Sequence, residues 1–233
     1  MKKNCAGMGR WMIRMAREYK SLVVMAVYAV FYLTAFYYLE RRTVSYYVIN
    51  FELDQYIPFC EIFVVPYFLW FAYVALTVCF LCVRDKQEAD KLVKFLIAGM
   101  TIFIVISAVF PNGHHLRPTY FERDNIFIDM IRGLYKADTS TNVLPSIHVY
   151  NSVAIMIAVW RSRCFADHKA IKAGMLGLGV SIIFSTVLIK QHSTIDVLLA
   201  LLLSALMYSI CYKGVSVSEK NGELHERRVK TSR

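Results

Sequence analysis

The chain has 233 residues, of which 57% are apolar and 14% aromatic, and Lys and Arg outnumber Asp and Glu by 27 to 17. This composition is too apolar for a disordered protein, and the length is too small for several domains. Long stretches contain no ionisable residue, whereas a soluble domain distributes its charges over its surface. We therefore expect one polytopic membrane domain, and we do not attribute the basic excess to nucleic-acid binding.

The chain begins with a basic segment, residues 1–20, followed by an apolar run over 21–39. No small-residue cleavage pattern follows this run, so we expect it to be retained as a first membrane span. Further apolar runs cover 62–83, 95–111, 143–160, 173–189 and 193–212. The predicted fold is therefore all-α, a six-transmembrane-helix bundle over residues 21–212. A polar tail follows at 213–233.

The distribution of Lys and Arg predicts the orientation of the bundle. Of the 27 basic residues, 20 lie in the amino-terminal segment, the tail, and the connections 84–94 and 161–172. Basic residues favour the cytoplasmic side of a membrane. Both termini are therefore predicted to be cytoplasmic, and the connections 112–142 and 190–192 are predicted to lie outside.

The six cysteines do not form a pattern of exposed pairs. Cys79, Cys82 and Cys211 lie inside apolar runs, and Cys5 and Cys164 lie among basic residues. No disulfide framework or metal site is expected, and the C-x-x-C at Cys79 and Cys82 is interpreted as helix packing.

Polar side chains inside membrane spans are costly, so the few that occur here are the first candidates for function. They are His148 near the outer end of the fourth span, and His192 and Asp196 at the outer start of the sixth. His192 and Asp196 are four residues apart and share a helix face. A carboxylate at this spacing fixes one ring nitrogen and leaves the other as a nucleophile. The alternatives are a buried polar pair that ties two helices together, and a metal pair that lacks an obvious third ligand.

The segment from Asn142 to His148 has the features of a helix start. Pro145 is tolerated in a first helical turn, and Asn142 or Ser146 can satisfy free backbone donors. Such an end binds anions, and His148 is then in a position to protonate a leaving oxygen. The alternative is a capped helix with a structural histidine.

Three motifs follow one another along the chain: R-P at Arg117, P-S-x-H ending at His148, and S-x6-H-x3-D from Ser185 to Asp196. In this combination the chain resembles the type 2 phosphatidic acid phosphatase superfamily. That superfamily has a six-helix core with the motifs K-x6-R-P, P-S-G-H and S-R-x5-H-x3-D, and its members are metal-independent enzymes that form a phosphohistidine intermediate.

The resemblance implies a role for each matching residue. His192 is implied to be the nucleophile, Asp196 its orienting partner and His148 the acid. Phosphate oxygens are implied to bind Arg117, Ser146 and Ser185, and Lys190 is a nearby source of positive charge. His114 and His115 are nearby donors that we expect in a surface loop.

The chain departs from the motifs at three positions. Phe110 stands in place of the lysine, Ile147 in place of the glycine and Thr186 in place of the second arginine. The sphingomyelin synthase branch of the superfamily, whose third motif reads H-Y-T-x-D-V, also lacks that arginine. It transfers a phospho-head group to a second lipid alcohol and uses the same histidine.

Three hypotheses for the function follow. The first is a cell-membrane phosphatase that acts on a lipid phosphate or pyrophosphate at the extracytoplasmic face, with no metal or other cofactor. The second is a lipid head-group phosphotransferase with the same nucleophile. The third is a transporter or a non-enzymatic membrane protein in which the histidines form a proton relay or a structural cluster. Membrane lipids are the expected partners.

Overall fold

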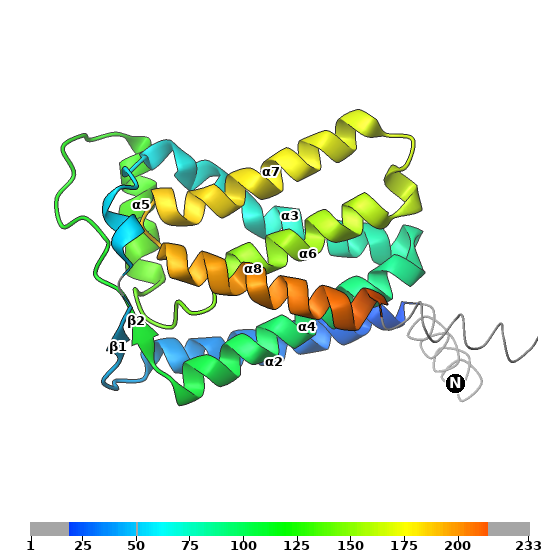
Figure 1. Cartoon of the computed structure of the whole chain (residues 1–233), viewed down its shortest axis with the longest axis horizontal. Coiled ribbons are helices and arrows are strands. Elements are labelled where there is room, and N and C mark those ends of the chain that lie inside the picture. The colour runs from blue at the N-terminus through cyan, green and yellow to red at the C-terminus, as the bar shows by residue number, and fades with distance from the viewer. Residues whose placement is uncertain (1–18, 50, 214–233) are drawn as a thin grey trace, which may run out of the picture.

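The chain is all-α in the computed structural model, which describes residues 19–49 and 51–213. Long helices run along one common direction, and α5 lies across one end of them (Figure 1). We call this end the α5 end. The helices are α2 (Lys20–Arg41), α3 (Val64–Arg84), α4 (Lys86–Val109), α5 (Ile126–Ala137), α6 (Ile147–Arg161), α7 (Lys169–Leu188) and α8 (Thr194–Tyr208).

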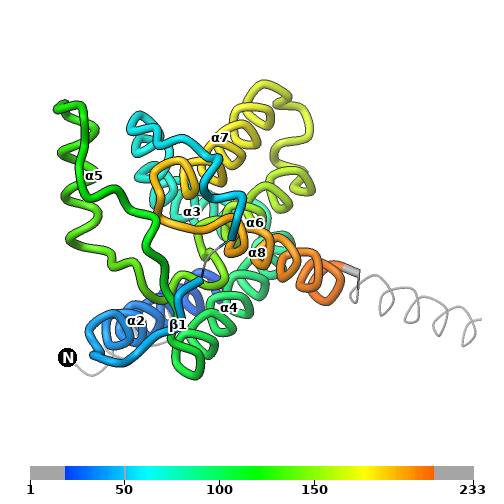
Figure 2. Tube along the Cα trace, turned by 60° about the vertical axis from the view of Figure 1, so that its left-hand side comes forward, coloured from blue at the N-terminus to red at the C-terminus, as the bar shows by residue number. Residues whose placement is uncertain are grey.

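Short elements complete the described chain. The 3-10 turns are η1 (Glu52–Gln55), η2 (Glu61–Phe63) and η3 (Arg163–Phe165), and a π-turn, η4 (Ser209–Lys213), continues α8. The strands β1 (Tyr47–Val48) and β2 (Asn112–Gly113) pair in parallel. This pairing ties the α2–α3 connection to the connection that leads into α5, and Figure 2 shows that connection passing close to β1.

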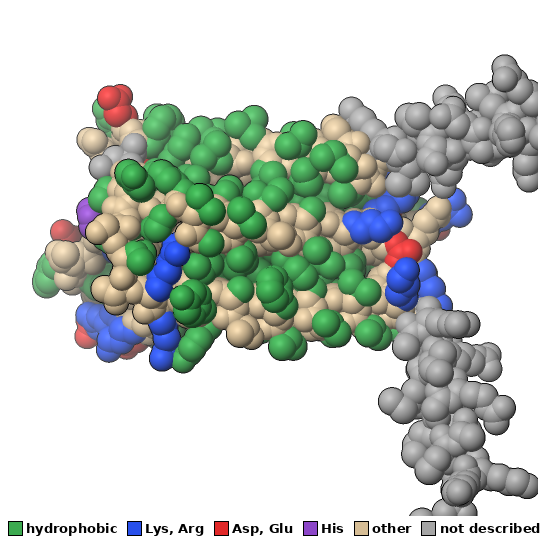
Figure 3. All heavy atoms as spheres, turned by 90° about the horizontal axis from the view of Figure 1, so that it is seen from below, with side chains coloured by type: hydrophobic (Ala, Val, Ile, Leu, Met, Phe, Trp, Pro, Cys, Tyr) green, Lys and Arg blue, Asp and Glu red, His purple; other side chains and the backbone are tan. Residues whose placement is uncertain are grey.

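Five of the predicted spans are confirmed as helices that are long and apolar enough to cross a membrane, namely α2, α3, α4, α7 and α8. The fourth predicted span, α6, has 15 residues, fewer than the roughly 20 that a spanning helix needs. It contacts α3, α4, α7 and α8, so other helices surround it. Figure 3 shows apolar side chains over the length of the bundle and charged side chains gathered at its two ends.

The predicted connection over 84–94 is wrong, because most of it is helical. α3 ends at Arg84 and α4 begins at Lys86, which leaves only Asp85 between them. The Asp85 side chain caps α4 by accepting a hydrogen bond from the Glu88 backbone N–H (3.2 Å). A cap of this kind satisfies a backbone donor and allows the helix to begin before the apolar run does.

The connection over 112–142 contains a helix that hydropathy did not predict. The α5 helix is amphipathic, and the Asn125 side chain caps it by accepting hydrogen bonds from the N–H groups of Phe127 and Ile128. Its buried face carries Ile128, Ile131 and Leu134, and it contacts α3. Because only this face is apolar, α5 covers the end of the bundle instead of crossing it.

The predicted basic segment and the polar tail fall almost entirely outside the described residues. The cytoplasmic placement of both termini and the division at residues 20 and 212 stay predictions. The described part of the chain carries the bundle and all of the sequence motifs.

Gly99 allows α4 and α6 to approach closely. A Cβ atom at Gly99 would lie 2.0 Å from Cε1 of Tyr150. The Tyr150 ring is fully buried, and its hydroxyl donates to the Phe95 carbonyl (2.8 Å), so the ring has no space into which to move. Small residues at such contacts are typical of membrane helix pairs.

We predict that Gly99→Ala lowers the free energy of unfolding by about 1–3 kcal/mol, because the added methyl overpacks this contact. The measurement is the melting temperature of the detergent-solubilised protein. Gly174→Ala is the matched control, since a Cβ there meets no atom within 4 Å. Equal melting temperatures for the two variants would contradict the close α4–α6 contact.

Candidate active site

The amino-terminal ends of α6 and α8 meet at the α5 end of the bundle. The Ser146 side chain caps α6 by accepting from the Val149 N–H (3.4 Å), and the Ser146 N–H donates to the backbone carbonyl of Asp196 (3.3 Å). Asn112 holds the preceding segment, because its Oδ1 accepts from the N–H groups of Val143 and Leu144 (both 3.0 Å). The start of α6 is therefore fixed against the start of α8.

The start of α8 carries the predicted histidine–aspartate pair. The Asp196 Oδ2 atom accepts from the Ser193 N–H (2.8 Å) and lies 3.3 Å from His192 Nδ1. Ser193 and Asp196 form a capping box, so Asp196 also stabilises the helix end. With Nδ1 donating to the buried carboxylate, the lone pair of His192 lies on Nε2. Within the described chain, Nε2 has no hydrogen-bond partner.

His148 lies between two aromatic rings of α3. Its ring centroid is 4.4 Å from that of Tyr67 and 4.3 Å from that of Trp70. The centroid of the His192 ring is 5.8 Å away. Both ring nitrogens of His148 are buried without a hydrogen-bond partner among the described residues. The aromatic rings fix the orientation of the imidazole while leaving its polar atoms available to a ligand.

Both histidines line one small cavity of about 40 Å³, which we call the histidine cavity. No Lys or Arg is among its lining residues, and the described chain contains no group of three side chains that could hold a metal ion. The residues that line the histidine cavity are Phe36, Phe103, Asp138, Thr139, Thr141, Asn142, Val143, Ile147, His148, Gln191 and His192.

Arg117 lies beside the histidine cavity and does not line it. Its guanidinium donates to the backbone carbonyls of Tyr135 (3.2 Å), Asp138 (2.9 Å) and Thr139 (2.7 Å), and to the side-chain oxygen of Gln191. It also lies over the Tyr135 ring, 4.4 Å from the centroid. In this conformation Arg117 holds the turn after α5, and Gln191 stands between it and the cavity.

The structure does not bring Ser185 and Lys190 into the cavity. The Ser185 hydroxyl donates to the Ile182 carbonyl of its own helix (2.6 Å). The Lys190 amine donates to the carbonyls of Asp54 (3.0 Å) and Ile57 (2.6 Å), and its backbone has a positive φ of 53°. Burial lowers the pKa of the Lys190 amine. Of the predicted phosphate ligands, Ser146 is hydrogen-bonded to Asp196 through its backbone N–H, although it does not line the cavity.

The positions that depart from the motifs have other contacts. Phe110 stacks on Tyr47, with ring centroids 4.7 Å apart, and Ile147 lines the histidine cavity. The carbonyl of Thr186 accepts from the N–H groups of Gln191 (2.9 Å) and His192 (3.0 Å). Thr186 thus helps to hold the turn that carries His192. Phe110, Ile147 and Thr186 supply no positive charge to the cavity.

The expectation that His114 lies in a surface loop is wrong. Its side chain is buried, Nε2 donates to the Gln191 carbonyl (2.8 Å), and Nδ1 accepts from the Leu116 N–H (3.2 Å). Burial lowers the pKa of His114 to about 4, so the ring is neutral at pH 7. The neighbouring His115 is exposed, as predicted for both.

Asp54 is a site residue that the sequence did not predict. It is buried, and its carboxylate accepts from the Ser193 hydroxyl, the Thr194 N–H (2.7 Å) and the Thr194 hydroxyl (2.8 Å). It therefore fixes the residues between His192 and Asp196. No local pattern identifies it, because it lies about 140 positions away in a different connection.

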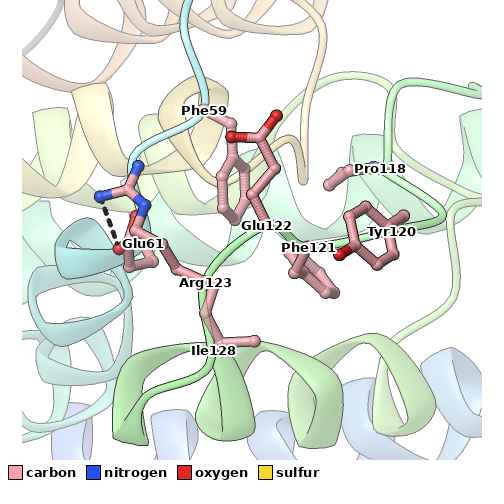
Figure 4. A pocket seen from close by; sticks show the side chains of 8 residues that line it. All are labelled: Phe59, Glu61, Pro118, Tyr120, Phe121, Glu122, Arg123 and Ile128. Atoms are coloured by element: carbon pink, nitrogen blue, oxygen red, sulfur yellow. Dashed lines mark ion pairs between the residues drawn. The ribbon is translucent and has the colours of Figure 1, made fainter.

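A second cavity, of about 250 Å³, lies under the connection that leads into α5. Figure 4 shows Arg123 pointing to Glu61 at its edge, and their closest atoms are 3.0 Å apart. Its walls are Phe59, Glu61, Pro118, Tyr120, Phe121, Glu122, Arg123 and Ile128. It contains neither histidine, so the smaller histidine cavity is the candidate active site.

Comparison with known proteins gives one match. Residues 116–220 match the family model described as the PAP2 superfamily. This range includes Arg117, both histidines of the cavity and Asp196. No curated protein and no solved structure matches the chain.

We predict that His114 makes the stability of the protein depend on pH. An unfolded histidine has a pKa near 6.5, and in the folded protein the value is lowered to about 4. The unfolded chain therefore binds the proton more tightly. His114 contributes about 3 kcal/mol above pH 6.5, and this contribution is lost as the pH falls from 6.5 to 4.

The measurement is the melting temperature between pH 7.5 and 4. The loss on acidification is expected to be smaller in His114→Gln, whose amide retains a donor for the Gln191 carbonyl. His115→Gln serves as the control and is expected to keep the wild-type dependence. Identical curves for His114→Gln and the wild type would contradict the burial of a neutral His114.

Proposed function

Since residues 116–220 are a PAP2 superfamily domain, we propose that this chain is an integral membrane enzyme that hydrolyses a lipid phosphate or pyrophosphate. Membership of this superfamily implies membrane phosphatase-type activity, and its members are generally metal-independent. The proposed mechanism has a phosphohistidine intermediate on His192. The distribution of Lys and Arg supports a site on the extracytoplasmic side of the cell membrane.

One observation carries the proposal: His192 and His148 line the same cavity, and each has a ring nitrogen without a hydrogen-bond partner among the described residues. His192 is oriented by the buried Asp196, which is what a nucleophilic imidazole requires. His148 is held by aromatic rings at a ring-centroid distance of 5.8 Å from His192. This is the arrangement of a nucleophile and an acid on either side of one phosphorus atom.

In the first step, the Nε2 lone pair of His192 attacks phosphorus, and the bond from phosphorus to the leaving oxygen breaks. The negative phosphate supplies the counter-charge for a proton on the buried His148, and this imidazolium donates its proton to that oxygen and becomes neutral. In the second step, His148 takes a proton from water, whose oxygen attacks phosphorus and breaks the P–N bond. Inorganic phosphate leaves and His192 is regenerated. Asp196 keeps the Nδ1 proton throughout.

The phosphate oxygens require donors while charge builds on them. The start of α6 supplies backbone N–H groups and the positive end of a helix dipole, next to the buried Ser146. Arg117 contributes positive charge from behind Gln191. Lys190 remains in the proposal only as a residue that holds the turn bearing His192, because its amine binds backbone carbonyls, and the Ser185 hydroxyl binds a carbonyl within α7.

A second candidate, transfer of a phospho-head group to another lipid alcohol, is favoured by the charge of the cavity. No Lys or Arg lines it, and Phe110 and Thr186 replace two cations of the motifs. A phosphodiester carries one negative charge fewer than a monoester, so it needs fewer cations. The nucleophile and the first step are the same, and an alcohol replaces water in the second step.

The test is release of phosphate from a panel of lipid phosphates in detergent, with EDTA present. We expect His192→Ala to lower kcat by at least about 10³-fold, because the covalent step is lost. Asp196→Asn is expected to lower it by about 10²- to 10⁴-fold, since the ring loses its orientation. His115→Ala, an exposed histidine outside the cavity, is the control and should retain activity.

A parallel reaction contains a phosphodiester lipid and an acceptor alcohol. Transfer of the head group to the acceptor without phosphate release would show that the protein is a transferase and not a hydrolase. Absence of both reactions in the wild-type protein would leave the non-enzymatic membrane protein as the remaining hypothesis. Loss of activity on EDTA addition would contradict metal-independent chemistry.

A further inference from the structure

Asp138 is a carboxylate in the histidine cavity for which the proposed reaction has no use. It follows α5 and lines the cavity together with His148 and His192. Its Oδ2 accepts from the Tyr67 hydroxyl (3.2 Å) and the Gln191 amide (3.4 Å). Both bonds end on Oδ2, and within the described chain Oδ1 has no partner. One oxygen of the carboxylate is therefore available to a ligand.

The charged groups near this carboxyl have both signs, Glu40 on one side and Arg117 and His192 on the other. Burial, and then the neighbouring Glu40, raise the pKa of the Asp138 carboxyl, while His192 and Arg117 act in the opposite direction. The Arg117 guanidinium donates to backbone carbonyls and to Gln191, and it forms no ion pair with Asp138. A phosphate with two negative charges would enter a cavity that the Asp138 carboxyl lines and that no Lys or Arg lines.

Aromatic rings form another wall of the same cavity. Phe36 of α2 and Phe103 of α4 both line it, with ring centroids 6.1 Å apart. Aromatic faces together with a carboxylate are the groups that bind ammonium ions in proteins, through cation–π attraction and charge pairing. An ammonium ion in the cavity would supply the positive charge that the motif positions 110 and 186 lack.

We propose that Asp138, Phe36 and Phe103 form a subsite for an ammonium group of the lipid, so that the substrate carries this group close to its phosphate. This inference rests on the proposed function, which places the phosphate next to His192. Two lipid classes have this chemistry: phosphodiesters with an amino-alcohol head group, and long-chain-base phosphates with an amine on the backbone. In both, two carbons separate the ammonium nitrogen from a phosphate ester oxygen, so the two charges lie close together on one lipid.

The subsite determines specificity without entering the bond-breaking steps. The ammonium group pairs with Asp138 Oδ1 and leaves the phosphorus facing His192 Nε2. A lipid phosphate without an amine places its own negative charge beside the Asp138 carboxyl and has no group to pair with Oδ1. The enzyme therefore distinguishes lipids by the group next to the phosphate.

The test is equilibrium binding to the His192→Ala protein, which cannot form the covalent intermediate. The probes are short-chain lipids in two matched pairs: phosphatidylcholine against phosphatidylglycerol, and sphingosine 1-phosphate against phosphatidic acid. In at least one pair, we expect the lipid with the ammonium group to bind about tenfold more tightly or better. The pair that shows the preference identifies the source of the amine.

The variant Asp138→Asn, made in the His192→Ala protein, is expected to reduce that preference to within about threefold. Glu122→Gln is the matched control and should retain the preference, since Glu122 is an exposed carboxylate outside the histidine cavity. If Asp138→Asn does not fold, Phe36→Leu and Phe103→Leu test the same subsite, because loss of either ring is expected to reduce the preference.

Equal binding within both pairs, or a preference that survives removal of Asp138 or of the rings, would overturn the subsite. Because the binding protein cannot turn over, this result does not depend on catalysis. If ammonium lipids are preferred but the wild-type protein neither hydrolyses nor transfers them, the proposed function fails and the subsite stands.

Discussion

Asp196 joins the starts of two helices, and the candidate site depends on that junction. Its backbone carbonyl accepts from the Ser146 N–H at the start of α6, while its carboxylate accepts from Ser193 and lies 3.3 Å from His192 Nδ1. The same carboxylate therefore stabilises the start of α8 and orients the imidazole of His192. Because Asp196 is fully buried, losing either role leaves unpaired polar groups away from water. This arrangement is compatible with both interpretations of the pair, a buried polar contact that ties two helices together and a nucleophile held by its orienting carboxylate.

The connections around the α5 end supply the rest of the support. Asp54 holds Ser193 and Thr194 from the α2–α3 connection, and His114 holds the Gln191 carbonyl from the connection before α5. Arg117 fastens the turn after α5, which places the Asp138 carboxyl in the cavity. Buried polar groups in such a network are costly unless each is paired. The two ring nitrogens of His148 are buried without a partner among the described residues, and a bound phosphate is proposed to contact this ring.

Much of the bundle could be predicted from the sequence, because hydropathy and the i, i+4 spacing are local properties. Five spans and the His192–Asp196 contact follow from them. The short helix α6 was predicted with an earlier start, since the apolar residues Val143 and Leu144 continue the hydropathy signal although the helix begins only at Ile147, after its cap Ser146. Asp54 and Asp138 could not be predicted as neighbours of the turn that carries His192. Their approach depends on how separate connections meet, and no local pattern records it. Lys190 illustrates the same limit: proximity in sequence suggested the cavity, but its positive φ turns it toward Asp54 and Ile57.

The central claim is that His192 becomes covalently phosphorylated. The most direct measurement is acid-quench and base-quench trapping of the purified protein after brief reaction with a lipid labelled at its phosphorus. The account predicts label on the protein that is stable to base, lost in acid, located by mass spectrometry on His192 and absent from His192→Ala. It should persist, and accumulate more slowly, in His148→Ala. Turnover without any label on His192, or equal labelling of the wild type and His192→Ala, would contradict the account.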